Sequence, residues 1–177
     1  PGPGGRADRG SGRARGAGSG ARRIRVGYLS GDLHMHAVGL LTAELFGGKT
    51  VALFAVPGAF TPTCSARHLP GYVDHRADLA GKGVDTVACV SVNDAFVMGA
   101  WAKANDLNGA DDVVMLADGN GDFTRAVGLA LDAKGFGMGE RSQRYSMLVK
   151  DGVVDQLNIE QGGEFKVSSA EHLLAQL

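Results

Sequence analysis

An apolar run that ends at a cysteine-bearing loop places the strongest constraint on the fold of this chain. Residues 50–56, Thr-Val-Ala-Leu-Phe-Ala-Val, are almost all apolar, which is typical of a strand buried on both faces of a sheet. Pro57 and Pro62 interrupt the run, and Cys64 then precedes a helix-competent stretch from Ser65. The pattern therefore places a thiol in the first turn of a helix. Unpaired backbone N–H groups and the helix dipole stabilise a thiolate there, although position alone also fits an inert buried cysteine.

Apolar runs after Cys64 predict the remaining strands of one sheet. Two short β-branched runs predict buried strands at 84–90 and 113–116. Near the C-terminus, segments 145–149 and 153–159 flank an Asp-Gly pair, which favours a hairpin turn. The strands alternate with helix-like segments, an order typical of α/β domains.

Four helices are expected between and after these strands, at 64–79, 93–105, 123–131 and after a capping box at 168–171. The first should kink at Pro70, because proline lacks the backbone donor that a helix needs. Asn93 is expected to cap the second, with Phe96, Val97 and Trp101 at helical spacing.

Composition excludes several classes of function. The 177 residues are enough for one domain with a solid core, and 44% apolar and 21% charged residues are typical of globular chains. A net charge of −1 gives no electrostatic argument for a nucleic-acid or membrane partner, and no apolar stretch approaches the length of a membrane span. Two cysteines are too few for a disulfide scaffold and suit a reducing compartment, so a cytoplasmic location is expected.

Four segments, taken together, carry a family resemblance. They are Phe-Ala-Val-Pro-Gly-Ala-Phe-Thr-Pro-Thr-Cys-Ser-Ala-Arg-His-Leu-Pro-Gly-Tyr at 54–72, Val-Ala-Cys-Val-Ser-Val-Asn-Asp-Ala-Phe at 87–96, Gln-Arg-Tyr-Ser-Met at 143–147 and Ser-Ser-Ala-Glu at 168–171. In this order the chain resembles the type II (Prx5-like) peroxiredoxins over residues 45–177. The resemblance implies an α/β thioredoxin-like fold, a central mixed sheet flanked by helices. It also implies a thiol-dependent peroxidase that reduces hydrogen peroxide and alkyl hydroperoxides through a cysteine sulfenic acid.

The resemblance assigns roles to four residues. Cys64 would be the peroxidatic nucleophile, and Thr61 would present its hydroxyl to the thiolate and the peroxide. Arg144 would be the permanent cation that stabilises the thiolate and the developing charge on oxygen, and Pro57 would wall the pocket. Singly, each has an ordinary structural explanation: Thr61 as a helix cap, Pro57 as loop punctuation and Arg144 as a surface charge.

Further expectations concern the substrate, the reductant and the assembly. Thr63, Gly58 and Phe136 are expected to bind the substrate, and no metal or other cofactor is implied. Cys89 is either a resolving cysteine or a small buried hydrophobe, and the second interpretation is favoured because it lies inside an apolar strand. The implied cycle then uses one cysteine and an external thiol, glutaredoxin with glutathione or thioredoxin. The resemblance implies a homodimer, and the alternative function is a peroxide sensor or thiol switch.

The N-terminal part of the chain does not fit this family. Residues 1–23 are rich in glycine and arginine and predict a disordered leader, which could also be the remnant of an organelle transit peptide. Residues 24–44 form an atypical segment, part of which resembles the opening of O-GlcNAc-transferase-like glycosyltransferases, with Asp32 and His36 at the matching spacing. His34 and His36 alone are too few for a metal site.

Overall fold

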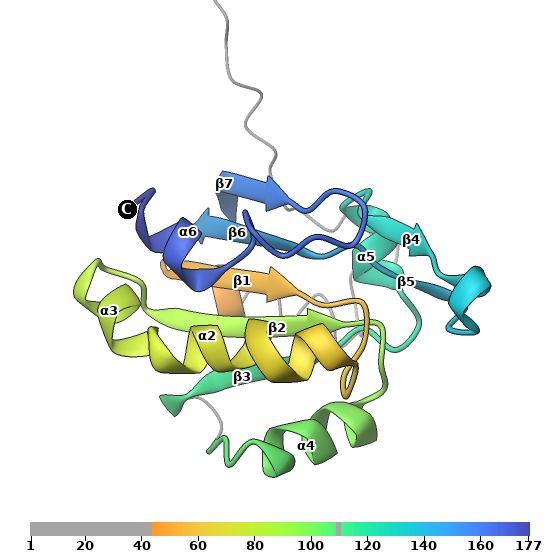
Figure 1. Cartoon of the computed structure of the whole chain (residues 1–177). Helices are drawn as coiled ribbons and strands as arrows, with labels where there is room; N and C mark the ends of the chain where they lie inside the picture. Colours follow the sequence, from red (N-terminus) through yellow and green to blue (C-terminus); the bar gives the residue numbers. More distant parts are fainter. Residues whose placement is uncertain (1–43, 109–110) are drawn as a thin grey trace, which may run out of the picture.

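A five-stranded mixed sheet organises the fold (Figure 1). The computed structural model describes residues 44–108 and 111–177, so the expectations for 1–43 lie outside the described residues. The strand order is β3-β2-β1-β6-β7, in which β1, β2 and β3 are parallel and β6 is antiparallel to both β1 and β7. The strands are β1 (Thr50–Ala55), β2 (Thr86–Ser91), β3 (Val113–Ala117), β6 (Tyr145–Lys150) and β7 (Val153–Ile159). The predicted thioredoxin-like α/β fold is confirmed.

The central strand β1 divides its side chains between two cores. Ala52 and Phe54 point into the core on one face, whereas Val51 and Leu53 point into the core on the other. Side chains alternate along a strand, so a strand covered on both faces must be apolar at every position. This double burial explains the continuous apolar run that opens the sequence pattern.

Helices cover both faces of the sheet. On one face lie η1 (Cys64–His68), α2 (Leu69–Asp74), α3 (Arg76–Gly81), α4 (Ala95–Ala104) and α6 (Ala170–Leu174), which contribute to the core containing Phe54. Helix α5 (Asp122–Ala126) packs on the opposite face, in the core containing Leu53. A small ribbon projects beyond the sheet (Figure 1), made of β4 (Ala130–Asp132), the 3₁₀ turn η3 (Lys134–Phe136) and β5 (Glu140–Ser142). None of the helices in the described part of the chain combines the length and apolar character needed to cross a bilayer.

The first predicted helix is divided into three pieces. Cys64–His68 is a π-helical turn, in which the N–H of Leu69 bonds to the carbonyl of Cys64. Pro70 lies in the first turn of α2, where its missing donor costs least. The change from π-helix to α-helix thus falls directly before Pro70, where the kink was predicted, and a second interruption at His75, which separates α2 from α3, was not predicted.

Helix α4 differs from its prediction at its first turn. Asp94, not Asn93, is the N-cap and accepts from the N–H of Val97 at 2.9 Å. Trp101 is fully buried, but Phe96 is 90% exposed. Helix α4 lies beside the edge strand β3 (Figure 1), and its buried residues are Met98 and Trp101.

Two other element boundaries were also wrong. The segment predicted as a helix at 123–131 contains α5 and then β4, because Gly128, at a φ of 74°, turns the chain into the strand. The final helix is capped by Ser169, whose hydroxyl oxygen accepts from the N–H of His172 at 3.2 Å. Ser168, the expected cap, donates its hydroxyl to Glu160 instead.

Candidate active site

Cys64 and Arg144 meet beside the end of the central strand. Cys64 is the first residue of η1 and is fully buried. Arg144 precedes Tyr145, which pairs with Ala55 at the end of β1, so the antiparallel register brings the arginine to the loop that carries the cysteine. Nη2 of Arg144 lies 3.5 Å from Sγ of Cys64. The structure therefore joins the predicted nucleophile to the predicted cation, 80 residues apart in sequence.

A buried histidine orients the arginine. Nη1 of Arg144 lies 3.1 Å from Nδ1 of His68, and Nε2 of His68 lies 3.1 Å from the carbonyl oxygen of Ser168. Burial, together with the charge of Arg144, lowers the pKa of His68 from 6.5 to about 3, so the imidazole is neutral at physiological pH. Its proton must lie on Nε2, facing the carbonyl, because Nδ1 faces a donor. His68 therefore makes one hydrogen bond on each side of its ring.

Aromatic rings enclose this histidine. Its ring centroid lies 4.9 Å from that of Phe54 and 5.0 Å from that of Phe165. Phe165 in turn lies under two guanidinium groups, Arg67 at 4.8 Å and Arg144 at 5.9 Å from its centroid. A cation over an aromatic face is attracted by the ring quadrupole, so Phe165 helps to hold Arg144 in place.

Thr61 is held in the loop before the cysteine. Its hydroxyl donates to the carbonyl of Gly58 at 2.8 Å, which leaves the oxygen lone pairs available as acceptors. A Cβ at Gly58 would lie 3.1 Å from Cγ2 of Thr61, a tight contact that Thr61 could accommodate only by shifting slightly. Gly58, predicted to bind substrate, contacts Thr61 but does not line the cavity described next.

A cavity of about 660 Å³ opens beside this loop. Five of the residues predicted for the site line it: Pro57, Thr61, Thr63, Phe136 and Arg144. Leu131 and Met138 give the wall around Phe136 an apolar character. Cys64 is fully buried and is not among the residues that line this cavity; Arg144 lines the cavity and contacts the Cys64 thiol from that side.

Cys89 lies in β2, next to Phe54 of β1 in the parallel register. It is fully buried, and both cysteines are free thiols. Burial, with a further contribution from Cys64, raises the pKa of the Cys89 thiol well above its ordinary value. Such a thiol stays protonated, which favours the interpretation of Cys89 as a small buried hydrophobe.

Sequence reasoning missed two residues that support the site. Oδ1 of Asn93, expected to cap a helix, instead accepts from the N–H of Ala59 at 3.0 Å. Oε1 of Glu160 accepts from the N–H of Lys166 and from the N–H and hydroxyl of Ser168, at 2.6 to 2.8 Å. Burial opposes the charge of Glu160, but these hydrogen bonds and the charge of Arg144 lower its pKa. No sequence pattern pointed to Glu160, whereas the Asn-Asp pair at 93–94 marked a capping region without distinguishing its two members.

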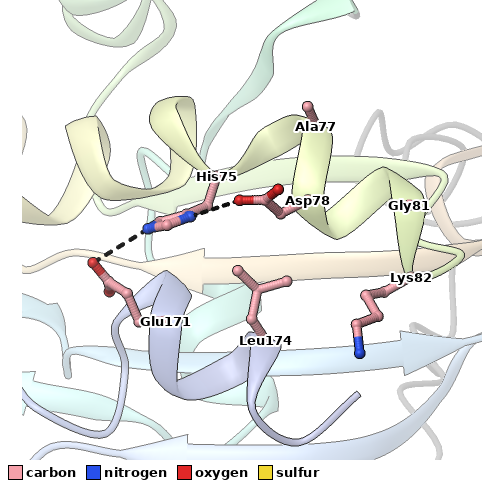
Figure 2. Close-up of a pocket in the computed structure, with 7 residues that line it drawn as sticks. All are labelled: His75, Ala77, Asp78, Gly81, Lys82, Glu171 and Leu174. Carbon is pink, nitrogen blue, oxygen red and sulfur yellow. Dashed lines mark hydrogen bonds and ion pairs between the residues drawn. The ribbon is translucent and has the colours of Figure 1, made fainter.

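A second cavity, of about 590 Å³, lies between α3 and α6 (Figure 2). There His75 contacts Asp78 through Nδ1 at 3.0 Å and Glu171 through Nε2 at 3.5 Å (Figure 2). The hydrogen bond to Asp78, more than the contact with Glu171, raises the pKa of His75. No predicted site residue lines this cavity, and no cluster of three potential metal ligands occurs within 44–108 and 111–177.

A buried thiol at the start of a helix, held by an arginine beside a thioredoxin-like sheet, defines the class of thiol redox domains related to thioredoxin. Residues 36–174 match the family model Redoxin. The chain belongs to the redoxin family and, within it, to the type II (Prx5-like) peroxiredoxins.

Three similar proteins illustrate this membership. Over 137 residues the chain is 56% identical to "Peroxiredoxin-2E-2, chloroplastic" of Oryza sativa, covering 76% of this chain and 60% of the rice protein. It is 53% identical over 150 residues to "Peroxiredoxin-2E, chloroplastic" of Arabidopsis thaliana, covering 84% of this chain and 62% of the Arabidopsis protein. The chain thus spans about three fifths of the length of these relatives. The fold also matches the crystal structure of reduced Prx3 of Vibrio vulnificus in complex with hydrogen peroxide, with a TM-score of 0.72. The two sequences are 56% identical, and the match covers 80% of this chain and 88% of the Vibrio chain.

Proposed function

We propose that the chain is a thiol-dependent peroxidase that reduces hydrogen peroxide and alkyl hydroperoxides. The thiolate of Cys64 attacks one peroxide oxygen, and the O–O bond breaks. The product is a sulfenic acid on Cys64 and an alkoxide or hydroxide, which takes up a proton and leaves as alcohol or water. Two external thiols then reduce the sulfenic acid, releasing water and a disulfide.

One observation carries this proposal: the hydrogen bond from Arg144 to the buried sulfur of Cys64, at 3.5 Å. A fixed cation at this position stabilises the thiolate before attack and the charge on the departing oxygen afterwards. The neutral His68 accepts a hydrogen bond from the other terminal nitrogen, Nη1, of Arg144. The guanidinium is therefore already in place and does not have to reorganise during the reaction.

The remaining site residues act on the substrate. The backbone N–H groups of Thr63 and Cys64 complete the polarisation of the peroxide, and Thr61 accepts its O–H. Pro57 limits water at the sulfur. The apolar cavity wall around Phe136 accommodates an alkyl group, and the hydrogen peroxide complex of the Vibrio relative supports a peroxide as substrate.

The proposed reductant is external, because Cys89 is a buried, protonated thiol in a central strand. Glutaredoxin with glutathione and thioredoxin are the two candidates. A homodimer is proposed as well, and Phe60, 54% exposed on the loop before Cys64, offers an apolar contact for it. The word "chloroplastic" in the names of the two plant relatives supports the organelle alternative over a cytoplasmic location. The proposed enzymatic domain is 45–177.

The test is hydrogen peroxide consumption with each reductant system, comparing the wild type with Cys64→Ser and Cys89→Ser. We expect Cys64→Ser to abolish turnover and Cys89→Ser to retain it, which would establish a one-cysteine cycle. Full turnover by Cys64→Ser would refute the proposal. Stoichiometric oxidation of Cys64 without turnover in either system would favour the sensor alternative.

A further inference from the structure

The peptide group between Gly58 and Ala59 is held at both of its polar ends. Its N–H donates to Oδ1 of Asn93 at 3.0 Å, and its C=O accepts the hydroxyl of Thr61 at 2.8 Å. The peptide group is planar, so fixing the direction of its N–H also fixes the direction of its C=O. Asn93 therefore determines where the acceptor of the Thr61 hydroxyl proton lies.

Ser91 fixes the side chain of Asn93 in turn. Its buried hydroxyl lies 2.7 Å from Oδ1 of Asn93 and 3.2 Å from the carbonyl oxygen of Val56, so its single proton serves the closer acceptor. The N–H of Ala59 and the hydroxyl of Ser91 are both donors, so the amide of Asn93 must present its oxygen to them. The residue lies between the end of β2 and the cap of α4, which hold its backbone.

We propose that Asn93 is a positioning residue for peroxide reduction, acting through the Gly58–Ala59 peptide to hold the Thr61 hydroxyl as a hydrogen-bond acceptor for the substrate O–H. This inference rests on the proposed function. A hydroxyl carries one proton, and Thr61 gives that proton to Gly58. Its lone pairs then accept the O–H that hydrogen peroxide and alkyl hydroperoxides share, which aligns the O–O bond for attack by Cys64. Without Asn93 the peptide can rotate, and the hydroxyl loses its fixed direction.

The test separates substrate alignment from the state of the thiol. Two rates are measured for each variant: oxidation of Cys64 by hydrogen peroxide, and alkylation of Cys64 by iodoacetamide, which does not need the Thr61 hydroxyl. We expect Asn93→Ala to slow oxidation about tenfold and to leave alkylation unchanged. Asn93→Asp keeps an acceptor oxygen for both donors and should restore oxidation to within about threefold of the wild type.

Asp94→Ala is the matched control, because it removes the cap of the same helix without touching Ala59. It should lower the melting temperature by as much as Asn93→Ala or more, while oxidation by peroxide stays at the wild-type rate. If Asn93→Ala does not fold, Ser91→Ala tests the same network, since it frees the Asn93 amide. In that variant oxidation should slow about threefold and alkylation should not.

A double variant, Asn93→Ala with Thr61→Val, tests whether Asn93 acts through Thr61. If Asn93 acts through Thr61, its loss should cause no further slowing of oxidation in the Thr61→Val background. Multiplicative effects, or equal slowing of oxidation and alkylation, would overturn the inference and leave the proposed function intact. A folded wild type that is alkylated but never oxidised by peroxide would overturn both.

Discussion

Nη1 of Arg144 lies 3.1 Å from Nδ1 of His68, and the arginine donates because the imidazole is neutral. The opposite nitrogen of the ring donates to the carbonyl of Ser168, so the histidine connects the loop before α6 to the cation that contacts Cys64. A protonated ring would place a donor and a second positive charge against the guanidinium. The site thus depends on a histidine that stays uncharged.

Arg144→Lys should greatly impair reaction with peroxide. The guanidinium contacts Cys64 through Nη2 and His68 through Nη1, and a single ammonium on a flexible stem cannot reproduce both contacts. We expect the rate constant for oxidation of Cys64 by hydrogen peroxide to fall about a hundredfold, as measured by stopped flow. Arg125→Lys, at an exposed arginine paired with Asp122 and Glu140, is the control and should react at the wild-type rate.

Acid should destabilise the protein through His68. Its pKa is about 3 in the folded state against 6.5 ordinarily, so below pH 6.5 the unfolded state binds more protons. Its contribution to stability is therefore complete above pH 6.5 and decreases as the pH falls towards 3. Acidification from pH 6.5 to 4.5 should therefore lower the free energy of unfolding by about 2 kcal/mol through His68. Urea unfolding of the wild type and His68→Gln across this range measures the difference. If the two stability curves stay parallel, the assignment is wrong.

His75 should show the opposite dependence. Its contacts with Asp78 and Glu171 raise its pKa, so its contribution is complete below pH 6.5 and disappears as the pH rises through the folded-state pKa (Figure 2). The group is partly exposed, so the effect should be at most about 1 kcal/mol. The stability difference between the wild type and His75→Gln should be larger at pH 5.5 than at pH 9. A difference that grows with pH would contradict the prediction.

Gly58→Ala should affect the reaction more than the fold. The new Cβ would lie 3.1 Å from Cγ2 of Thr61, so the Thr61 side chain, which lines the cavity, must shift slightly. We expect peroxide oxidation of Cys64 to slow about tenfold, with a small change in melting temperature. Gly71→Ala is the matched control: no heavy atom lies within 4 Å of its Cβ position in α2, and it should add up to about 1 kcal/mol of stability. Equal peroxide rates for the two variants would contradict this account.

The fold could be predicted from the sequence where one local pattern allowed one structure. The apolar run of β1 and the Asp-Gly hairpin of β6 and β7 lie where they were expected. Boundaries were missed where neighbouring residues had equal local preferences. Asn93 and Asp94 both favour N-caps, and so do Ser168 and Ser169. In each pair, a hydrogen bond to another segment engages the first residue and leaves the second to cap the helix. Asn93 bonds to Ala59, and Ser168 bonds to Glu160.

The candidate site was predicted less completely than the fold. The family resemblance predicted Cys64, Thr61 and Arg144. In the structure, Thr61 lies in the loop after β1, Cys64 begins the helix that follows it, and Arg144 lies directly before β6. The residues that hold them could not be found this way, because their partners are far apart in the chain. His68 bonds to Ser168, 100 residues later, and Asn93 bonds to Ala59, 34 residues earlier. Only the packed sheet brings such pairs together.

The position of β1 in the sheet has a consequence for local unfolding. Backbone amides of a strand paired on both sides exchange with solvent only when a large part of the domain opens. Strand β1 is such a strand, whereas β7 lies at the edge of the sheet. Deuterium exchange should therefore be slowest just before the loop of Pro57 and faster in β7. The loop of Pro57 is thus anchored, at its first residue, on the part of the molecule that opens last.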